Sequence, residues 1–313
     1  METLVSNAAP RPRHRGVSQW ALAWRRFKKN RAAIAGLFVI GFIGFMAAFD
    51  RLVAPYPPSC IIGISSQCPG GGLQSYRPNA PPSLANPFGI DSNGYDVYSQ
   101  VVYGARAAFL VGMGVSAISM TIALLIALVA GYYGGIIDNI LMRFTEVFLV
   151  LPFLLILLVF LKVFFTFNTT ATGGLLIVIF IIGILSWPGN ARIMRGDILR
   201  VKEFEYIEAS RQIGASGTRI LFRHILPNVL HILIVLTTLQ IAAAVLTEAG
   251  VSFLGFGDPN SPTWGREIAL GAQSVNQAWW VGAFPGIFLT LLVMGFNLLG
   301  NGLRDALDPR LRE

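Results

Sequence analysis

The sequence predicts an all-α protein that crosses the membrane six times, and three observations support this prediction. Hydrophobic residues make up 54% of the 313 residues and charged residues only 13%, whereas a soluble domain carries about 25% charged residues. Six stretches with almost no charge approach the roughly 20 residues that a helix needs to cross the hydrocarbon core. Basic residues concentrate before the first of these stretches and in a central region at 192–223. This distribution is typical of cytoplasmic segments in membrane proteins.

The net charge of +8 also raises the question of nucleic-acid binding. That interpretation requires basic residues gathered on a water-exposed surface. Here the basic residues flank apolar stretches instead. Membrane orientation therefore explains them, and we expect no nucleic-acid partner.

The N-terminal third of the chain alternates between polar and apolar character. Residues 1–31 are expected to form a cytoplasmic tail ending in an interfacial helix, in which Trp20, Trp24 and Phe27 share one face. Residues 32–50 then form the first transmembrane helix. Residues 51–106 are rich in proline and glycine and contain few basic residues, which predicts a loop outside the membrane.

Two features of this external loop bear on covalent and metal chemistry. Cys60 and Cys68 both lie in it, and an oxidising compartment permits a disulfide between them. Two free thiols fit the sequence equally well. Acidic and amide side chains alternate at 91–96, but the twelfth-position glutamate of an EF-hand is missing, so we expect no metal site.

Residues 107–303 form the predicted core, with the other five transmembrane helices. These are expected at 107–133, 147–167, 173–191, 229–248 and 281–303. Asp138 and Arg143 mark a short cytoplasmic connection, which follows a turn at Gly134 and Gly135.

The two remaining segments complete the predicted topology. Residues 251–280 form a second external loop, and residues 304–313 form a cytoplasmic tail. Six crossings place both termini and a central loop at 203–228 on the cytoplasmic side.

The central loop is predicted to contain two short amphipathic helices. Apolar residues recur there at three- or four-residue spacing: Phe204, Ile207, Leu221 and Ile225. Gly214 separates the two helices, Ser216 or Thr218 caps the second, and Pro227 is expected to end or kink it. Each helix keeps an apolar strip that has to pack against another element.

Polar residues within the transmembrane stretches are few. Glu248 lies at the outer end of the fifth, where capping the following segment at 252–257 is favoured over contact with a substrate. Four small polar residues either line a path or join helices through hydrogen bonds, and packing is the favoured role: Ser116, Ser119, Asn297 and Asn301.

The sequence offers no catalytic or metal site. It has no GxxxxGK[ST] phosphate loop and no Gly-x-Ser-x-Gly motif, and its three histidines form no metal-ligand spacing with the cysteines. Transmembrane stretches nearly free of ionisable residues also lack an ion relay. Energy for any transport would therefore arrive mechanically, and the central loop is the cytoplasmic segment suited to receive it.

The central loop carries a family resemblance. The spacing Glu208-Ala209, Gly214, Leu226-Pro227 resembles the "EAA" loop of permease subunits in ATP-binding-cassette (ABC) importers, and the peptide-importer branch in particular. Further runs are similar to the same family over roughly 87–311: Pro87-Phe88-Gly89, Tyr103-Gly104-Ala105-Arg106, residues 131–139 and residues 252–257. The chain departs from the usual pattern at Ser210 and His224.

The resemblance implies roles for residues of the central loop. Glu208 would contact an ATPase, Ala209 would allow close packing, Gly214 would supply a sharp bend and Pro227 would fix the direction of the following helix. Ser210, Arg219 and Leu226 belong to the same expected coupling surface.

The resemblance also implies an assembly in the bacterial inner membrane. It would contain a homologous permease partner, two ATPases that bind ATP and Mg, an extracytoplasmic binding protein and surrounding lipid. No cofactor is expected in this chain. A nickel or other small-solute importer, a structural or regulatory membrane subunit that transports nothing, and an intramembrane enzyme are the alternatives. The last lacks its catalytic residues.

Overall fold

The fold is built of helices. The structure is a computed structural model, and it describes residues 24–62, 68, 77–167 and 173–307. Helices are the only extended regular elements in these ranges, as the sequence predicted, and an isolated bridge joins Ile90 to Asp96. The elements are α2 (Arg31–Ala48), α3 (Asp50–Val53), α4 (Val97–Tyr133), α5 (Gly135–Val150), α6 (Phe153–Phe167), α7 (Gly174–Leu185), α8 (Pro188–Lys202), α9 (Glu205–Gln212), α10 (Gly217–Ile220), the π-helical turn η1 (Leu221–Ile225), α11 (Leu226–Phe253), α12 (Trp264–Gln273) and α13 (Trp280–Leu307).

The apolar helices agree with the predicted number of crossings. Within the described residues, four helical stretches are long and apolar enough to cross a membrane: α2, α4, the continuous stretch Gly217–Phe253 and α13. Two further pairs are bent, α5 with α6 by 83° and α7 with α8 by 44°. Counting each bent pair as one crossing gives six.

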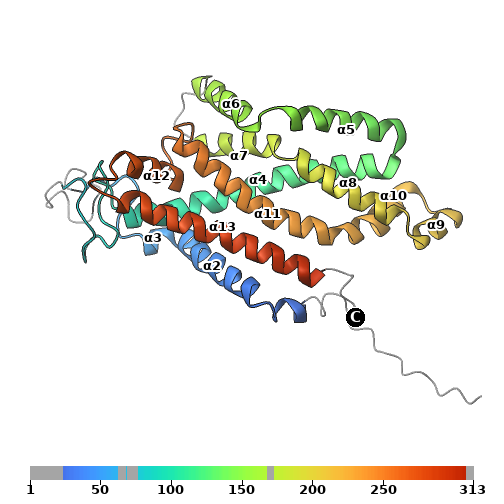
Figure 1. Cartoon of the computed structure of the whole chain (residues 1–313), viewed down its shortest axis with the longest axis horizontal. Coiled ribbons are helices and arrows are strands. Elements are labelled where there is room, and N and C mark those ends of the chain that lie inside the picture. Colours follow the sequence, from blue (N-terminus) through green and yellow to red (C-terminus); the bar gives the residue numbers. More distant parts are fainter. Residues whose placement is uncertain (1–23, 63–67, 69–76, 168–172, 308–313) are drawn as a thin grey trace, which may run out of the picture.

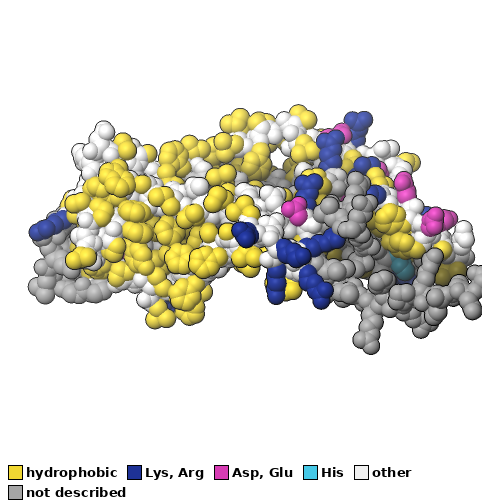
Figure 2. Space-filling model, turned by 60° about the horizontal axis from the view of Figure 1, so that its bottom comes forward, with side chains coloured by type: hydrophobic (Ala, Val, Ile, Leu, Met, Phe, Trp, Pro, Cys, Tyr) yellow, Lys and Arg dark blue, Asp and Glu magenta, His cyan; other side chains and the backbone are white. Residues whose placement is uncertain are grey.

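The long helices lie side by side along the molecule, and the short elements gather at its two ends (Figure 1). Helices α9 and α10 lie at one end, whereas α3, α12 and the segment 77–96 lie at the other. Apolar side chains cover the middle of the surface, and Lys and Arg side chains concentrate toward the end that carries α8 to α10 (Figure 2). The central loop and the external loops thus occupy opposite ends of an apolar body.

Small residues set the spacing between α2 and α13. A Cβ added at Gly36 would lie 2.6 Å from the carbonyl oxygen of Gly295. Such glycine contacts let helices approach closely without side chains between them. Phe27, just before α2, packs with Ala33 and Ala306 at the other end of this helix pair. Its ring also stacks on Trp24 at 5.7 Å, while Trp20 lies outside the described residues.

Two predicted boundaries were wrong on the external side. Helix α4 begins at Val97 rather than at 107, because the Asp96 side chain accepts a hydrogen bond from the Ser99 N–H at 2.8 Å and caps the helix. The second external loop also contains a helix, α12, which Thr263 caps. Local capping side chains therefore extended helices into segments that composition marked as loops.

Boundaries on the opposite side were predicted only in part. The predicted turn at Gly134 and Gly135 is confirmed, with φ of +68° and +56°, but the expected connection at Asp138 and Arg143 is part of α5, and the chain bends again at Leu151 and Pro152. Helix α8 continues past the predicted end of the crossing at 191, as far as Lys202. Pro227, which was expected to end or kink a helix, does not end one, because the chain stays helical from Gly217 to Phe253.

The π-helical turn η1 explains how the helix passes Pro227. In this turn the Leu226 N–H donates to the carbonyl oxygen of Leu221, one residue further back than in an α-helix. The Asn228 side chain then donates to the carbonyl oxygen of His224 at 2.6 Å. A proline ring clashes with the carbonyl four residues earlier in an ideal α-helix, and a widened turn at this point relieves that clash.

The segments predicted to be external are tied to the ends of the long helices. Trp264 is buried, and its indole N–H donates to the carbonyl oxygen of Val101 at 2.9 Å. Trp280 donates in the same way to Ile90 at 3.3 Å. Cys60 and Cys68 form a disulfide with a Cα–Cα distance of 5.1 Å, in a small cluster of buried side chains.

Removing this disulfide is expected to loosen only the first external loop. A ring of this size restrains the locally opened loop by about 2–3 kcal/mol, and the half-cystines pack with Tyr56, Ile62 and Ile90 rather than with the long helices. The double variant Cys60→Ala/Cys68→Ala should therefore be cleaved faster by an added protease within residues 51–96. The midpoint temperature of its main thermal unfolding transition should change little. A large fall in that transition would contradict this expectation.

Candidate functional site

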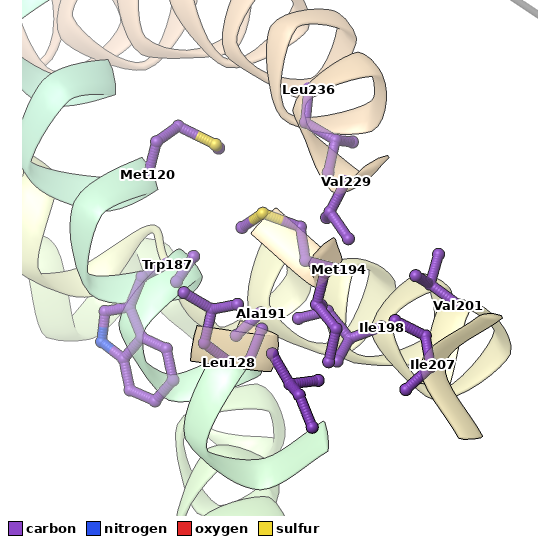
Figure 3. Close-up of a cluster of buried hydrophobic side chains, with 14 residues drawn as sticks. Met120, Leu128, Trp187, Ala191, Met194, Ile198, Val201, Ile207, Val229 and Leu236 are labelled. Atoms are coloured by element: carbon purple, nitrogen blue, oxygen red, sulfur yellow. The ribbon is translucent and has the colours of Figure 1, made fainter. Parts of the chain in front are cut away.

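The central loop rests on a core shared by five helices. Fourteen buried side chains from α4, α8, α9, α10 and α11, from the turn η1 and from the residue before α8 form this cluster (Figure 3). They are Met120, Ala123, Ala127, Leu128, Trp187, Ala191, Met194, Ile198, Val201, Ile207, Ile220, Ile225, Val229 and Leu236. Because the loop contributes Ile207, Ile220 and Ile225, which are at most 1% exposed, it is anchored in the transmembrane core.

Helix α9 has one buried and one exposed face. Ile207 belongs to the same buried cluster as Val201 of α8 (Figure 3), while Glu208 and Ala209 are exposed. The Glu208 side chain is 62% exposed and lies 3.6 Å from Arg211. Ala209 is therefore on the exposed face of α9 rather than in the buried cluster.

Gly214 provides the bend that the sequence predicted. Its φ is +82°, in the left-handed region that other residues avoid. Within the described part of the chain, a Cβ added here would meet no atom within 4 Å. The backbone conformation, rather than lack of space, therefore requires glycine. Ser210, on the preceding turn, donates its hydroxyl to the carbonyl oxygen of Tyr206 at 2.7 Å.

The second helix of the loop begins at Ser216. The Ser216 hydroxyl accepts a hydrogen bond from the Arg219 N–H at 3.4 Å, which decides between the two predicted capping residues. The side chains of Arg219 and Pro227 are exposed, and Leu226 is half-buried. Of these residues of the predicted coupling surface, Arg219 and Pro227 are therefore exposed, whereas Leu226 packs partly against the core.

A contact that the sequence analysis missed joins the loop to the end of α4. The Lys202 ammonium donates to the carbonyl oxygen of Tyr132 at 2.6 Å and lies 5.9 Å from the centre of its ring. A Cβ added at Gly217 would lie 2.7 Å from the Tyr132 hydroxyl. In the sequence, the glycine at position 217, directly after the capping residue, was the one indication that another part of the chain approaches closely here.

Polar side chains connect α8 to α5. Arg195 of α8 makes two hydrogen bonds to the Asp138 carboxylate of α5. Asp197 accepts from Arg200 at 2.6 Å and lies 3.8 Å from the imidazole Nε2 of His231 on α11. Helix α8, which leads into the loop, is therefore linked by charge to α5 and packs against α11 through the shared core.

The loop exposes apolar side chains beside its charges. Exposed fractions are 86% for Ile213, 58% for Phe222 and 42% for Tyr206. Partial burial raises the pKa of the Tyr206 hydroxyl above its ordinary value of 10.0. Aromatic and apolar groups rimmed by charge are typical of surfaces that bind another protein.

The polar residues of the transmembrane stretches do not form one group. Ser116 and Ser119 are buried in α4, and the Ser116 hydroxyl donates to the carbonyl oxygen of Thr237 on α11 at 3.3 Å. Asn297 is half-buried and borders a hollow of about 300 Å³ between α11 and α13, whereas Asn301 is exposed. The structure thus places the two serines in helix packing and the two asparagines at a surface.

Glu248 occupies a structural position at the outer end of α11. It is 3% exposed, and its carboxyl accepts a hydrogen bond from the Ser252 hydroxyl at 2.5 Å. A further hydrogen bond joins it to Thr263, the residue that caps α12. Glu248 therefore links α11 to the start of α12, as the capping interpretation requires.

Comparison with known proteins identifies the family. Residues 123–313 match the family described as "binding-protein-dependent transport system inner membrane component". Residues 18–82 match the "N-terminal TM domain of oligopeptide transport permease C".

Curated relatives resemble almost the whole chain. The dipeptide transport system permease protein DppC of Bacillus subtilis is 37% identical over 292 residues, which cover 93% of this chain and 85% of that protein. The oligopeptide transport system permease protein OppC of the same organism is 33% identical, with 96% and 92% covered. The glutathione transport system permease protein GsiD of Pectobacterium atrosepticum is 35% identical, with 94% and 92% covered. The chain belongs to the family of membrane-embedded permease subunits of ABC importers, in its dipeptide and oligopeptide branch.

Proposed function

We propose that this chain forms half of the translocation path of an ATP-driven importer for di- or oligopeptides. The observation that carries the proposal is that the central loop has one face buried in the core and one face exposed. Ile207, Ile220 and Ile225 are buried in the core of α4, α8 and α11, while Glu208 and Ile213 face outward on the same short segment. A force applied to the exposed face would therefore be transmitted to the long helices.

The proposed partners are those that the family implies, and this arrangement is compatible with them. The exposed face of α9 and the Gly214 bend would fit into a groove of an ATPase subunit, which would hold ATP and Mg. A homologous permease would supply the other half of the path. At the opposite end, the segment 77–96 and α12 would receive an extracytoplasmic binding protein. The end carrying α8 to α10 would be cytoplasmic, because basic side chains concentrate there (Figure 2).

The substrate assignment rests on the relatives. Their names specify dipeptides, oligopeptides and glutathione, which is itself a peptide. The chain itself is proposed to bind no cofactor and to catalyse no reaction.

Transport by the reconstituted complex tests the proposal. Proteoliposomes would contain this chain, its partner permease and two ATPases, with the binding protein outside. We expect ATP-dependent uptake of a labelled tripeptide, and no uptake of nickel ions. ATP hydrolysis without peptide uptake would reject the peptide assignment but keep the permease. Peptide uptake that persists when this chain is left out would reject both and favour a structural subunit.

A further inference from the structure

A hollow lined by three arginines lies between α5 and α8. Its volume is about 230 Å³, and Arg143 of α5 lines it together with Arg192 and Arg195 of α8. The two helices lie side by side at the end of the molecule that carries the central loop (Figure 1). The hollow is separate from the exposed face of α9, which the proposed coupling to an ATPase uses.

The Asp138 carboxylate fixes one wall of this hollow. Arg195 donates through Nε and through a terminal nitrogen to the two oxygens of this carboxylate. Asp138 is 8% exposed, and a guanidinium that is bound at two points is held in one orientation. The pair therefore holds α8 against α5, and its two charges balance each other.

Arg143 keeps most of its hydrogen-bond donors available. It donates to the Glu146 carboxylate at 3.2 Å, one turn further along α5, and its side chain is 85% exposed. An exposed pair of this kind is weak. Because a guanidinium has five N–H donors, Arg143 can also bind a second acceptor in the hollow.

Arg192 carries a charge that its neighbours leave unbalanced. It is exposed, and among the side chains that the structure describes none makes a hydrogen bond or an ion pair with it. Asp138 and Glu146 balance the other two arginines, so one positive charge is left over. A ligand with a single negative charge would therefore complete the hollow.

The polar part of the hollow lies near the membrane surface. Helix α5 begins at Gly135, directly after the turn at the end of α4, and the Lys202 ammonium lies beside this turn, 3.8 Å from a Cβ added at Gly134. At about 1.5 Å per residue, Asn139 and Arg143 are about 6–12 Å from the start of α5. The headgroup region extends roughly 5–8 Å beyond the hydrocarbon core on each side. The hollow is thus at the depth where lipid headgroups meet the core.

An apolar stripe of α5 continues from the hollow. Ile140, Phe144 and Val147 share one face at four- and three-residue spacing, and they are 63%, 51% and 58% exposed. Each directly follows one of the residues 139, 143 and 146, which line the hollow. The apolar stripe and the polar lining are therefore adjacent on the helix. Acyl chains and the phosphate of one phospholipid match this pair of surfaces, whereas inorganic phosphate offers nothing to the apolar stripe.

We propose that this hollow binds the phosphate of an anionic phospholipid, with Arg192 and Arg143 as donors and with the acyl chains along the apolar stripe of α5. Basic pockets between transmembrane helices are suited to anionic headgroups. The bound phosphate joins α5 to α8 at a second point beside the pair of Asp138 and Arg195, and it steadies the helix that leads into the central loop. The inference rests on the membrane crossings, and not on the peptide or the ATPase. Its failure would leave the proposed function standing.

Native mass spectrometry of the purified, delipidated complex tests the site. The complex is titrated with phosphatidylglycerol, which has one negative charge, or with zwitterionic phosphatidylcholine. We expect phosphatidylglycerol to bind more tightly. Arg192→Gln should weaken its binding by about tenfold, because a hydrogen bond between charged groups is lost. Arg304→Gln removes the same charge from an exposed position in the last turn of α13 and should keep native binding.

Several results of this titration would overturn the proposal. Equal affinity of the native complex for the two lipids would show that the site does not select an anionic headgroup. Native binding by Arg192→Gln, or equal losses in Arg192→Gln and Arg304→Gln, would show that the hollow is not the place of binding. Release of phosphatidylglycerol by an equal concentration of inorganic phosphate would show that the site takes the free ion.

A photo-crosslinking residue in place of Ile140 identifies the occupant of the stripe in the membrane. We expect it to label phospholipid, and a crosslink to the partner permease would overturn the proposal, because the stripe would then be a protein interface. If Arg192→Gln fails to assemble, thermal unfolding of Arg143→Gln decides. Phosphatidylglycerol should raise the thermal midpoint of the native complex more than that of Arg143→Gln, and equal rises would overturn the proposal.

Discussion

Replacing Glu208 by lysine is expected to stop peptide uptake while the complex stays assembled. Within the described residues, the Glu208 side chain has Arg211 as its charged neighbour, at 3.6 Å. Exposed pairs of this kind contribute about 0–1 kcal/mol, so the fold should tolerate the change. A reversed charge in an interface instead costs several kcal/mol, and each 1.4 kcal/mol changes an equilibrium by about tenfold. We expect uptake to fall by more than about tenfold.

Glu205→Lys is the matched control for this prediction. Glu205 lies in the first turn of the same helix and is also exposed, so both variants carry the same change in charge and in helix-dipole interaction. Uptake, ATP hydrolysis and co-purification of the ATPase would be measured for each. Equal losses in the two variants would mean that net charge matters, and the specific role of Glu208 would be rejected. Native uptake by Glu208→Lys would reject it as well.

Composition and charge were sufficient to predict the architecture, but they did not predict where each helix begins and ends. Apolar stretches of crossing length have few alternative folds in a membrane, since their backbone groups must bond internally. Boundaries depend on single side chains instead. Asp96 starts α4 within a glycine- and proline-rich segment, and η1 lets a helix continue through Pro227. Neither effect changes the local composition, so neither was predicted.

In the candidate site, the local features were predictable and the long-range ones were not. Gly214 was found because a positive φ strongly favours glycine, and Ser216 because capping acts over three residues. The contact between Lys202 and Tyr132 joins residues 70 positions apart. No periodicity in the sequence encodes such a pair.

Close contact between α11 and α12 leads to the second large expected effect. A Cβ added at Gly265 would lie 2.2 Å from the carbonyl oxygen of Ala249 and 2.7 Å from its Cα. These are backbone atoms, which cannot turn away as a flexible side chain would. Overpacking a well-filled site costs about 1–3 kcal/mol, and Gly265→Ala should cost at least that much, because α12 as a whole has to shift. The buried Trp264 beside it would lose its fit against α4.

Gly250→Ala should change the stability of the protein in the opposite direction, although Gly250 is the direct neighbour of Ala249. Among the described residues, a Cβ at Gly250 would meet no atom within 4 Å. Alanine in a helix is more favourable than glycine by about 0.5–1 kcal/mol. The thermal midpoint of the purified complex should therefore fall for Gly265→Ala and stay or rise for Gly250→Ala. If both midpoints fall alike, the partner permease covers Gly250, and contacts within this chain do not explain the difference. If Gly265→Ala keeps the native midpoint, α12 is not packed on α11 as closely as its backbone indicates.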